Sequence, residues 1–186
     1  MNKKTEYRLN FIWDYDKEEN WINEEAKNGW RLDKYFFIKY DFVSCEPGEY
    51  EYRIQLLDES AKSAKNRDYL AFLREMGINV VSKWFRWIYL EKKSDGTPFE
   101  LFSDRNSRLK HMKSVLTLIK TVGGMNGFIG VTNVLIGIIH SLNGTLYGSF
   151  NYIGVLNILV AVLSYYGAKR LKKISENLEV TGEVEE

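Results

Sequence analysis

The segment that decides the organisation of this chain runs from residue 121 to residue 168 and contains TVGGMNGFIGVTNVLIGIIH (121–140) and FNYIGVLNILVAVLSYYGA (150–168). Its 48 residues include no Lys, Arg, Asp or Glu, whereas the 120 residues before it carry 22 basic and 20 acidic side chains. Because about 20 mostly apolar residues span a bilayer as a helix, we expect two transmembrane spans, near 121–141 and 150–168. The alternative, a helical hairpin in a soluble core, normally keeps a charged solvent face, and these segments have none.

Basic residues flank the uncharged segment on both sides, whereas the turn-forming residues within it, 141–149, include none. By the positive-inside rule, this asymmetry predicts two spans in the cell membrane with both termini in the cytoplasm. The flanking cations are suited to hold anionic headgroups, so we interpret them as a membrane anchor and expect no nucleic acid partner. The predicted anchor residues are Lys113, Lys120, Lys169, Arg170, Lys172 and Lys173.

These boundaries divide the chain into four parts. We predict an α+β domain over 1–104 and a basic juxtamembrane helix or linker over 105–120. The transmembrane hairpin over 121–168 follows, and 169–186 form a basic collar and an acidic tail. The mean hydropathy of −0.33 averages over these parts and hides the apolar segment.

The soluble part contains a near repeat: EYRLNFI at 6–12 and EYRIQLL at 51–57. In each half a predicted helix follows and stops at a glycine, Gly29 or Gly77, and strand-like residues come next. Further matches are Trp21 with Tyr69, and Lys34-Tyr35-Phe36 with Lys83-Trp84-Phe85. The offset drifts from 45 to 49 residues, so chance similarity between strands is the alternative. We predict a duplicated βαβ unit that forms a ferredoxin-like domain, with two helices on one four-stranded sheet.

Local signals refine this prediction. Asp16 and Glu19 have the spacing of a capping box, which places the start of the first helix. The pairs Glu18-Glu19 and Glu24-Glu25 are then expected on an exposed helix face. Tyr35–Val43 and 99–102 are candidates for extra hairpin strands.

A set of residues in the soluble part resembles a bacterial family catalogued as domain of unknown function 2812. The residues are Glu19, Trp21, Ala26, Gly29-Trp30-Arg31-Leu32, Pro47-Gly48-Glu49-Tyr50-Glu51-Tyr52-Arg53 and Glu100-Leu101-Phe102-Ser103-Asp104. The resemblance covers roughly 8–104 and, more loosely, the apolar tail. It implies no catalytic residues, because the family has no assigned activity. Family genes often lie beside PadR-type regulators, which would imply a response to envelope stress or membrane-active compounds by association alone.

The reactive side chains form no recognised catalytic pattern. The sequence has two histidines, His111 and His140, and a single cysteine, Cys45, which lies in a predicted turn. A nucleophile needs a neighbouring base, and zinc needs clustered His or Cys ligands. We therefore expect no enzyme, no metal and no cofactor. A lone cysteine fits a reducing compartment and excludes an internal disulfide.

Small and polar residues recur on one side of each predicted span. On helical spacing they form two stripes: Gly123, Asn126, Gly127, Gly130, Asn133, Gly137 and His140 in the first, and Gly154, Asn157, Ala161, Ser164 and Ala168 in the second. Small residues let helix backbones approach closely, and amides can hydrogen-bond across. The stripes either pack the two spans together, which we favour, or contact a third helix from another copy or another protein.

The densest aromatic stretch is Trp84-Phe85-Arg86-Trp87. As a single strand it would place Trp84 and Arg86 on one face and Phe85 and Trp87 on the other, so we predict an interaction surface there. Together these features predict a non-enzymatic sensing or protein-interaction module anchored in the bilayer, which binds another protein or a second copy. The rival hypothesis is an accessory or immunity subunit of a transport complex that acts through its spans.

Overall fold

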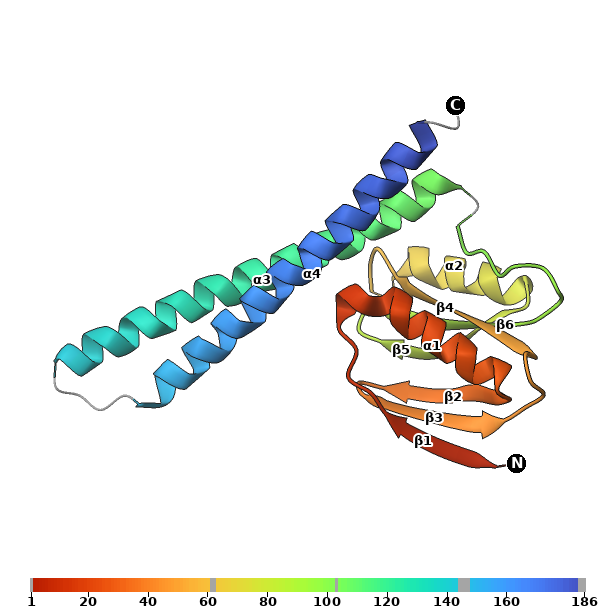
Figure 1. Ribbon diagram of the computed structural model, residues 1–186, viewed down its shortest axis with the longest axis horizontal. Coiled ribbons are helices and arrows are strands. Elements are labelled where there is room, and N and C mark those ends of the chain that lie inside the picture. Colours follow the sequence, from red (N-terminus) through yellow and green to blue (C-terminus); the bar gives the residue numbers. More distant parts are fainter. Residues whose placement is uncertain (1, 61–62, 103, 144–147, 184–186) are drawn as a thin grey trace. The chain divides into compact units, whose positions relative to one another are not determined.

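The computed structural model describes residues 2–60, 63–102, 104–143 and 148–183. The chain forms two compact units, Met1–His111 and Met112–Glu186 (Figure 1). The first is an α+β domain with two small antiparallel sheets, and the second consists of two long helices packed together.

Both halves of the first unit have the same order of elements: strand, helix, strand, strand. They are β1 (Lys3–Tyr7), the 3-10 turn η1 (Ile12–Asp14), α1 (Tyr15–Lys27), β2 (Trp30–Phe36) and β3 (Lys39–Ser44), then β4 (Tyr50–Leu56), α2 (Ala64–Glu75), β5 (Ile78–Trp84) and β6 (Trp87–Lys93). The sheets have the matching orders β1-β3-β2 and β4-β6-β5. The prediction of one four-stranded sheet is therefore wrong. After each helix a tight hairpin returns the chain between the first two strands, and each half closes its own three-stranded sheet.

The repeat extends to backbone irregularities. Gly29 and Gly77, which end α1 and α2, both have positive φ, at 82° and 77°. Both hairpins contain a register shift, between Leu32 and Lys34 and between Val80 and Ser82. Both turns place a phenylalanine in the left-handed region, at Phe37 (φ 57°) and Phe85 (φ 56°).

The sequence match that suggested the repeat is out of register. Tyr7 pairs with Lys39 and Leu56 pairs with Trp87, and these partners occupy the same place after the two turns. Tyr7 therefore corresponds to Leu56, 49 positions later, whereas the EYR similarity aligns residues 45 apart. The aromatic triplets are also misaligned by one residue, because Phe37 corresponds to Phe85.

The two halves meet at β2 and β5, which lie side by side without a shared ladder, and the Ser82 hydroxyl donates to the Tyr35 carbonyl at 2.7 Å. Helix α1 packs on both β2 and β4, so it crosses from its own half to the other, while α2 packs on β5. Phe99 is buried beside the second sheet, although the predicted strand over 99–102 does not form. Burial of such side chains stabilises the domain by about 25 cal/mol per Å² of apolar surface.

The helix starts differ from the predicted signals. α1 begins at Tyr15, and Asp14 at its N-cap makes no capping side-chain bond. The predicted capping box at Asp16 and Glu19 is therefore wrong, because the Glu19 carboxylate accepts from the Ile54 amide of β4 instead. In α2 the Ser63 side chain does cap the helix by accepting from the Asn66 amide at 3.3 Å.

The second unit is formed mainly by α3 (Arg105–Leu142) and α4 (Gly148–Glu183). Both are long and apolar enough to cross a membrane. In the most apolar 18-residue stretch of each helix, only 11% and 17%, respectively, is buried. A core helix of a soluble protein would be mostly buried, so these exposed helices could be membrane spans. Part of the predicted turn, 144–147, lies outside the described residues.

Candidate functional site

A cavity of about 40 Å³ lies where the two halves of the first unit meet. It has room for one or two water-sized groups. Six aromatic side chains and one carboxylate dominate its lining, which comprises Asn10, Phe11, Ile12, Tyr15, Glu18, Tyr35, Ile54, Trp84, Trp87 and Tyr89. The lining residues come from α1 and the segment before it, from β2, and from three strands of the second half.

The carboxylate belongs to Glu18, whose exposed fraction is 6%. Its Oε1 atom accepts hydrogen bonds from the hydroxyls of Tyr40 (2.7 Å) and Tyr89 (2.6 Å). Burial raises the pKa of Glu18, and the two tyrosine bonds and the charge of Arg8 oppose that shift. Burial also raises the pKa values of both tyrosines, so they remain hydroxyl donors. The sequence-based expectation that Glu18 is exposed is wrong.

A second buried carboxylate, Glu91, binds the two halves together. Its two oxygens accept from Arg31 Nη2 and Nε, both at 2.8 Å, and the Tyr52 hydroxyl donates to Oε2 at 2.8 Å. The Leu32 amide in turn donates to the Tyr52 hydroxyl at 3.0 Å. Arg31 lies on β2, Tyr52 on β4 and Glu91 on β6, so this charged network connects both sheets. The bond to Glu91 raises the pKa of Arg31.

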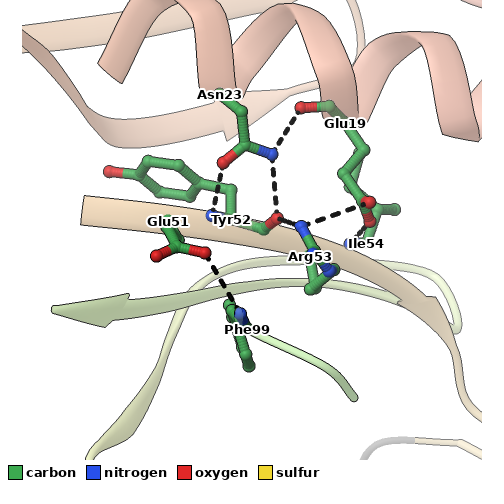
Figure 2. A network of polar contacts seen from close by, with 7 residues as sticks. All are labelled: Glu19, Asn23, Glu51, Tyr52, Arg53, Ile54 and Phe99. Carbon is green, nitrogen blue, oxygen red and sulfur yellow. Dashed lines mark hydrogen bonds and ion pairs between the residues drawn. The ribbon is translucent and has the colours of Figure 1, made fainter. Parts of the chain in front are cut away.

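Side chains from outside the sheet satisfy the amides along the outer side of β4 (Figure 2). Asn23 accepts from the Tyr52 amide at 2.8 Å and donates to the Tyr52 carbonyl at 3.0 Å. One helical turn earlier, Glu19 accepts from the Ile54 amide at 2.8 Å. Burial raises the pKa of Glu19, and the bond from Ile54 opposes this shift. Helix α1 thus lies against β4 through polar as well as apolar contacts.

The next outward amide, that of Leu56, donates to His111 Nε2 at 2.9 Å. His111 lies in the second turn of α3 and is 7% exposed, and burial lowers its pKa to about 4. The ring is therefore neutral near pH 7 and can accept this bond. It also contacts Tyr15 and Trp87, with ring centroids 5.5 and 6.4 Å away. Both aromatic residues line the cavity, so the cavity wall touches the first turns of α3.

The predicted aromatic surface does not form one strand. Trp84 ends β5, Phe85 and Arg86 form the turn, and Trp87 begins β6. Trp87 is buried and lines the cavity with Trp84, while Arg86 donates to the carbonyls of Leu57 and Asp58. Phe85 lies in the turn with a positive φ and is 70% exposed. The alternation expected from a continuous strand is wrong for this reason.

The two hairpin tips contribute an exposed aromatic patch. The Phe37 ring lies 6.0 Å from the Trp84 ring, so the turns of the two halves are neighbours. Phe37 and Phe85 are 53% and 70% exposed. We call Phe37, Trp84 and Phe85 the tip patch.

The predicted stripes of small residues face each other where α3 meets α4. A Cβ atom at Gly123 would lie 2.7 Å from Ser164 Cβ, and one at Gly127 would lie 3.5 Å from Ala161 Cβ. At Gly130 a Cβ would meet Ile158 and the Gly154 carbonyl within about 3 Å. Gly137 is buried in α3 and His140 is half-buried.

The amide side chains of the stripes bond within their own helices. The Nδ2 atoms of Asn126, Asn133 and Asn157 donate to the carbonyls of Val122, Ile129 and Ile153, each one turn earlier, at 2.9, 3.0 and 2.9 Å. One donor of each amide is thus already satisfied without a third helix. Such bonding to the preceding turn is common for polar residues in apolar helices.

The predicted anchor residues differ in their surroundings. Lys113 and Lys172 make exposed ion pairs with Glu179 (2.8 Å) and Glu176 (3.5 Å). Lys120, Lys169 and Lys172 line a groove between α3 and α4, whereas Lys173 is exposed and Arg170 is half-buried.

The functional candidates missed by the sequence analysis are Glu18, Glu91 and His111. Each is polar and buried, and its partners come from elements distant in sequence. For Glu18 a signal existed, because Ile22 and Ala26 follow it at helical spacing and both are buried with it.

The architecture defines a class of protein: an α+β domain joined to two long apolar helices that could be membrane spans. The chain belongs to the DUF2812 family, described as proteins of unknown function, whose model matches residues 14–123. The match thus includes α1, both sheets except β1, and the first half of α3. No curated protein and no solved structure matches the chain.

Proposed function

We propose that this protein is a non-enzymatic, membrane-anchored sensing module in which the cavity beside Glu18 reports its state to α3. The observation that supports this function is the double contact of Tyr15 and Trp87. Both line the cavity, and both touch His111 in the second turn of α3. A change in the cavity therefore has a short route to the helix that continues into the apolar segment.

The chemistry of the cavity favours a compact cation. Aromatic faces attract cations through their quadrupoles, and Glu18 supplies a carboxylate among them. The volume of about 40 Å³ limits what enters to a small group such as an ammonium or methylammonium head.

The anchor in this proposal is the α3–α4 pair, inserted in the cell membrane with both termini in the cytoplasm. The uncharged segment and its basic flanks support this orientation. The tip patch then faces the cytoplasm as a candidate contact for another protein or a second copy, because exposed aromatic clusters are typical of interfaces. A role in envelope stress or in the response to membrane-active compounds fits a membrane-anchored sensor. The rival role, as an accessory or immunity subunit acting through the spans, has less support because the amides in the apolar segment already bond within their helices.

The test compares hydrogen exchange in the full chain with that of two variants in detergent micelles. Glu18→Gln changes the cavity, and Glu24→Gln is the matched control, because Glu24 pairs with Lys27 on the exposed face of the same helix. We expect faster exchange of the Leu56 amide and of the first turns of α3 in Glu18→Gln alone. Addition of methylammonium chloride should slow the same amides in the wild type, with sodium chloride as the salt control. Unchanged exchange at these sites in every sample would refute the coupling.

A separate fractionation tests the anchor. The full chain should remain in the membrane pellet after an alkaline carbonate wash. Release into the supernatant would contradict the anchor without bearing on the cavity.

A further inference from the structure

We propose that the groove between α3 and α4 is a binding site for one anionic glycerophospholipid of the cytoplasmic leaflet. This inference rests on the proposed membrane anchor. The groove has a volume of about 410 Å³, which lies in the size range of ligand sites. It lies within the second unit, between the helices whose glycines let them approach closely.

Three lysines line one end of the groove: Lys120, Lys169 and Lys172. Among the residues that the structure describes, Lys120 and Lys169 have no acidic partner, and Lys172 makes only an exposed pair with Glu176 at 3.5 Å. Three cations that line one groove, two of them without an acidic partner among the described residues, suit a phosphate group.

Small residues form the floor of the groove, and Gly123, Gly124 and Ser164 are among them. Ser164, as a whole residue, is 5% exposed. The remaining floor is apolar and fits an acyl chain.

The groove lies where the uncharged segment meets its basic flanks. Lys120 directly precedes the uncharged segment and Lys169 directly follows it. In a bilayer this places the lysines among the headgroups and the floor at the top of the hydrocarbon layer. Tyrosine is enriched at the membrane–water interface, and Tyr165 also lines the groove. A lipid therefore matches both ends of the groove at once.

A second copy of the chain fits the groove less well. It would have to offer carboxylates at the level of the lysines. Glu176 and Glu179, the nearest acidic residues on α4 that the structure describes, already pair with Lys172 and Lys113. The phosphate of a lipid supplies the missing charge without breaking these pairs.

Native mass spectrometry of the full chain, extracted in a mild non-ionic detergent, tests the proposal. The protein is titrated with phosphatidylglycerol and, separately, with phosphatidylcholine of the same acyl chains. Since one well-placed lysine contributes about a fivefold gain in affinity, we expect one phosphatidylglycerol to bind at least about tenfold more tightly than phosphatidylcholine. Excess inorganic phosphate should not displace it.

Two variants and their controls identify the groove. The triple variant Lys120→Gln, Lys169→Gln, Lys172→Gln should lose the preference. Its control, Lys110→Gln, Lys113→Gln, Lys173→Gln, removes equal charge from the same helices and should keep it, because these lysines do not line the groove. Gly124→Leu should fill the groove and weaken both lipids, because a Cβ there meets no atom within 4 Å and the helices can keep their packing. Met125→Leu, at an exposed neighbour, is the steric control.

Four results would overturn the inference. Equal binding of the two lipids, or a preference that survives the first triple variant, would exclude recognition by these lysines. Displacement by inorganic phosphate would show a site for a free anion. A dimer that dissociates in Gly124→Leu would identify a second copy as the occupant. In each case the carbonate wash still decides separately whether the anchor exists.

Discussion

Acidification should weaken the first unit through one histidine. The pKa of His111 falls from its ordinary 6.5 to about 4 in the folded chain, mainly because the ring is buried. Between these two values the unfolded chain binds a proton that the folded chain does not, so stability falls as the pH falls. At about 1.4 kcal/mol per pH unit, lowering the pH from 6.5 to 4 removes about 3 kcal/mol. The protonated ring also cannot accept from the Leu56 amide.

The variant His111→Gln isolates this effect. Its amide oxygen can accept where Nε2 does but does not titrate. The stability difference between wild type and His111→Gln should therefore change by about 3 kcal/mol between pH 6.5 and pH 4, while contributions from carboxylates cancel. His140→Gln is the matched control, since it removes the other histidine from the second unit.

Urea unfolding of the full chain in detergent, followed by tryptophan fluorescence, is the suitable assay. All five tryptophans lie in the first unit, so the signal reports its unfolding alone. If the stability difference between wild type and His111→Gln stays constant between pH 6.5 and pH 4, the conclusion that His111 is buried as a neutral acceptor is refuted.

The other predictions concern the two buried carboxylates and the turn phenylalanines. Tyr89→Phe removes a hydrogen-bond donor to Glu18 and should lower the free energy of unfolding in urea by about 1.5 to 3 kcal/mol at pH 8. The loss should be smaller at low pH, where Glu18 is protonated, and equal losses at both pH values would contradict the hydrogen bond. Glu91→Gln leaves Arg31 without its carboxylate and should cost about 3 kcal/mol by the same assay, whereas Glu24→Gln, which breaks an exposed pair, should change stability by less than about 0.5 kcal/mol. Phe85→Gly relieves a left-handed backbone conformation at an exposed side chain and should raise the free energy of unfolding by up to about 1 kcal/mol, as measured by scanning calorimetry. A loss above about 1 kcal/mol would show that the ring has packing contacts in the folded chain.

Long uniform patterns were readable from the sequence. The uncharged segment predicts two long apolar helices because composition over some 20 residues needs no knowledge of partners. The glycine stops at Gly29 and Gly77 are equally local, and both have the positive φ that such stops require.

The sheets and the polar core could not be predicted in this way. A strand–helix–strand pattern in the sequence does not show where the next strand will lie. In the structure a turn of only two residues, such as Phe85 and Arg86, folds that strand back as a hairpin, so that it pairs between the first two strands. The exposure of Glu18 was mispredicted because its partners Tyr40 and Tyr89 lie 22 and 71 residues away. The two halves do repeat the same elements, but the most similar sequence segments give the wrong alignment between them. Equivalent strands need the same alternation of inward and outward side chains, not the same residues.

The side-chain bonds along β4 have a consequence for self-association. An edge strand with unpaired amides can pair with a strand from another molecule. Here Asn23, Glu19 and His111 already occupy the amides of Tyr52, Ile54 and Leu56. Addition of a strand from another molecule is therefore blocked along this part of β4, which is an edge strand of its sheet.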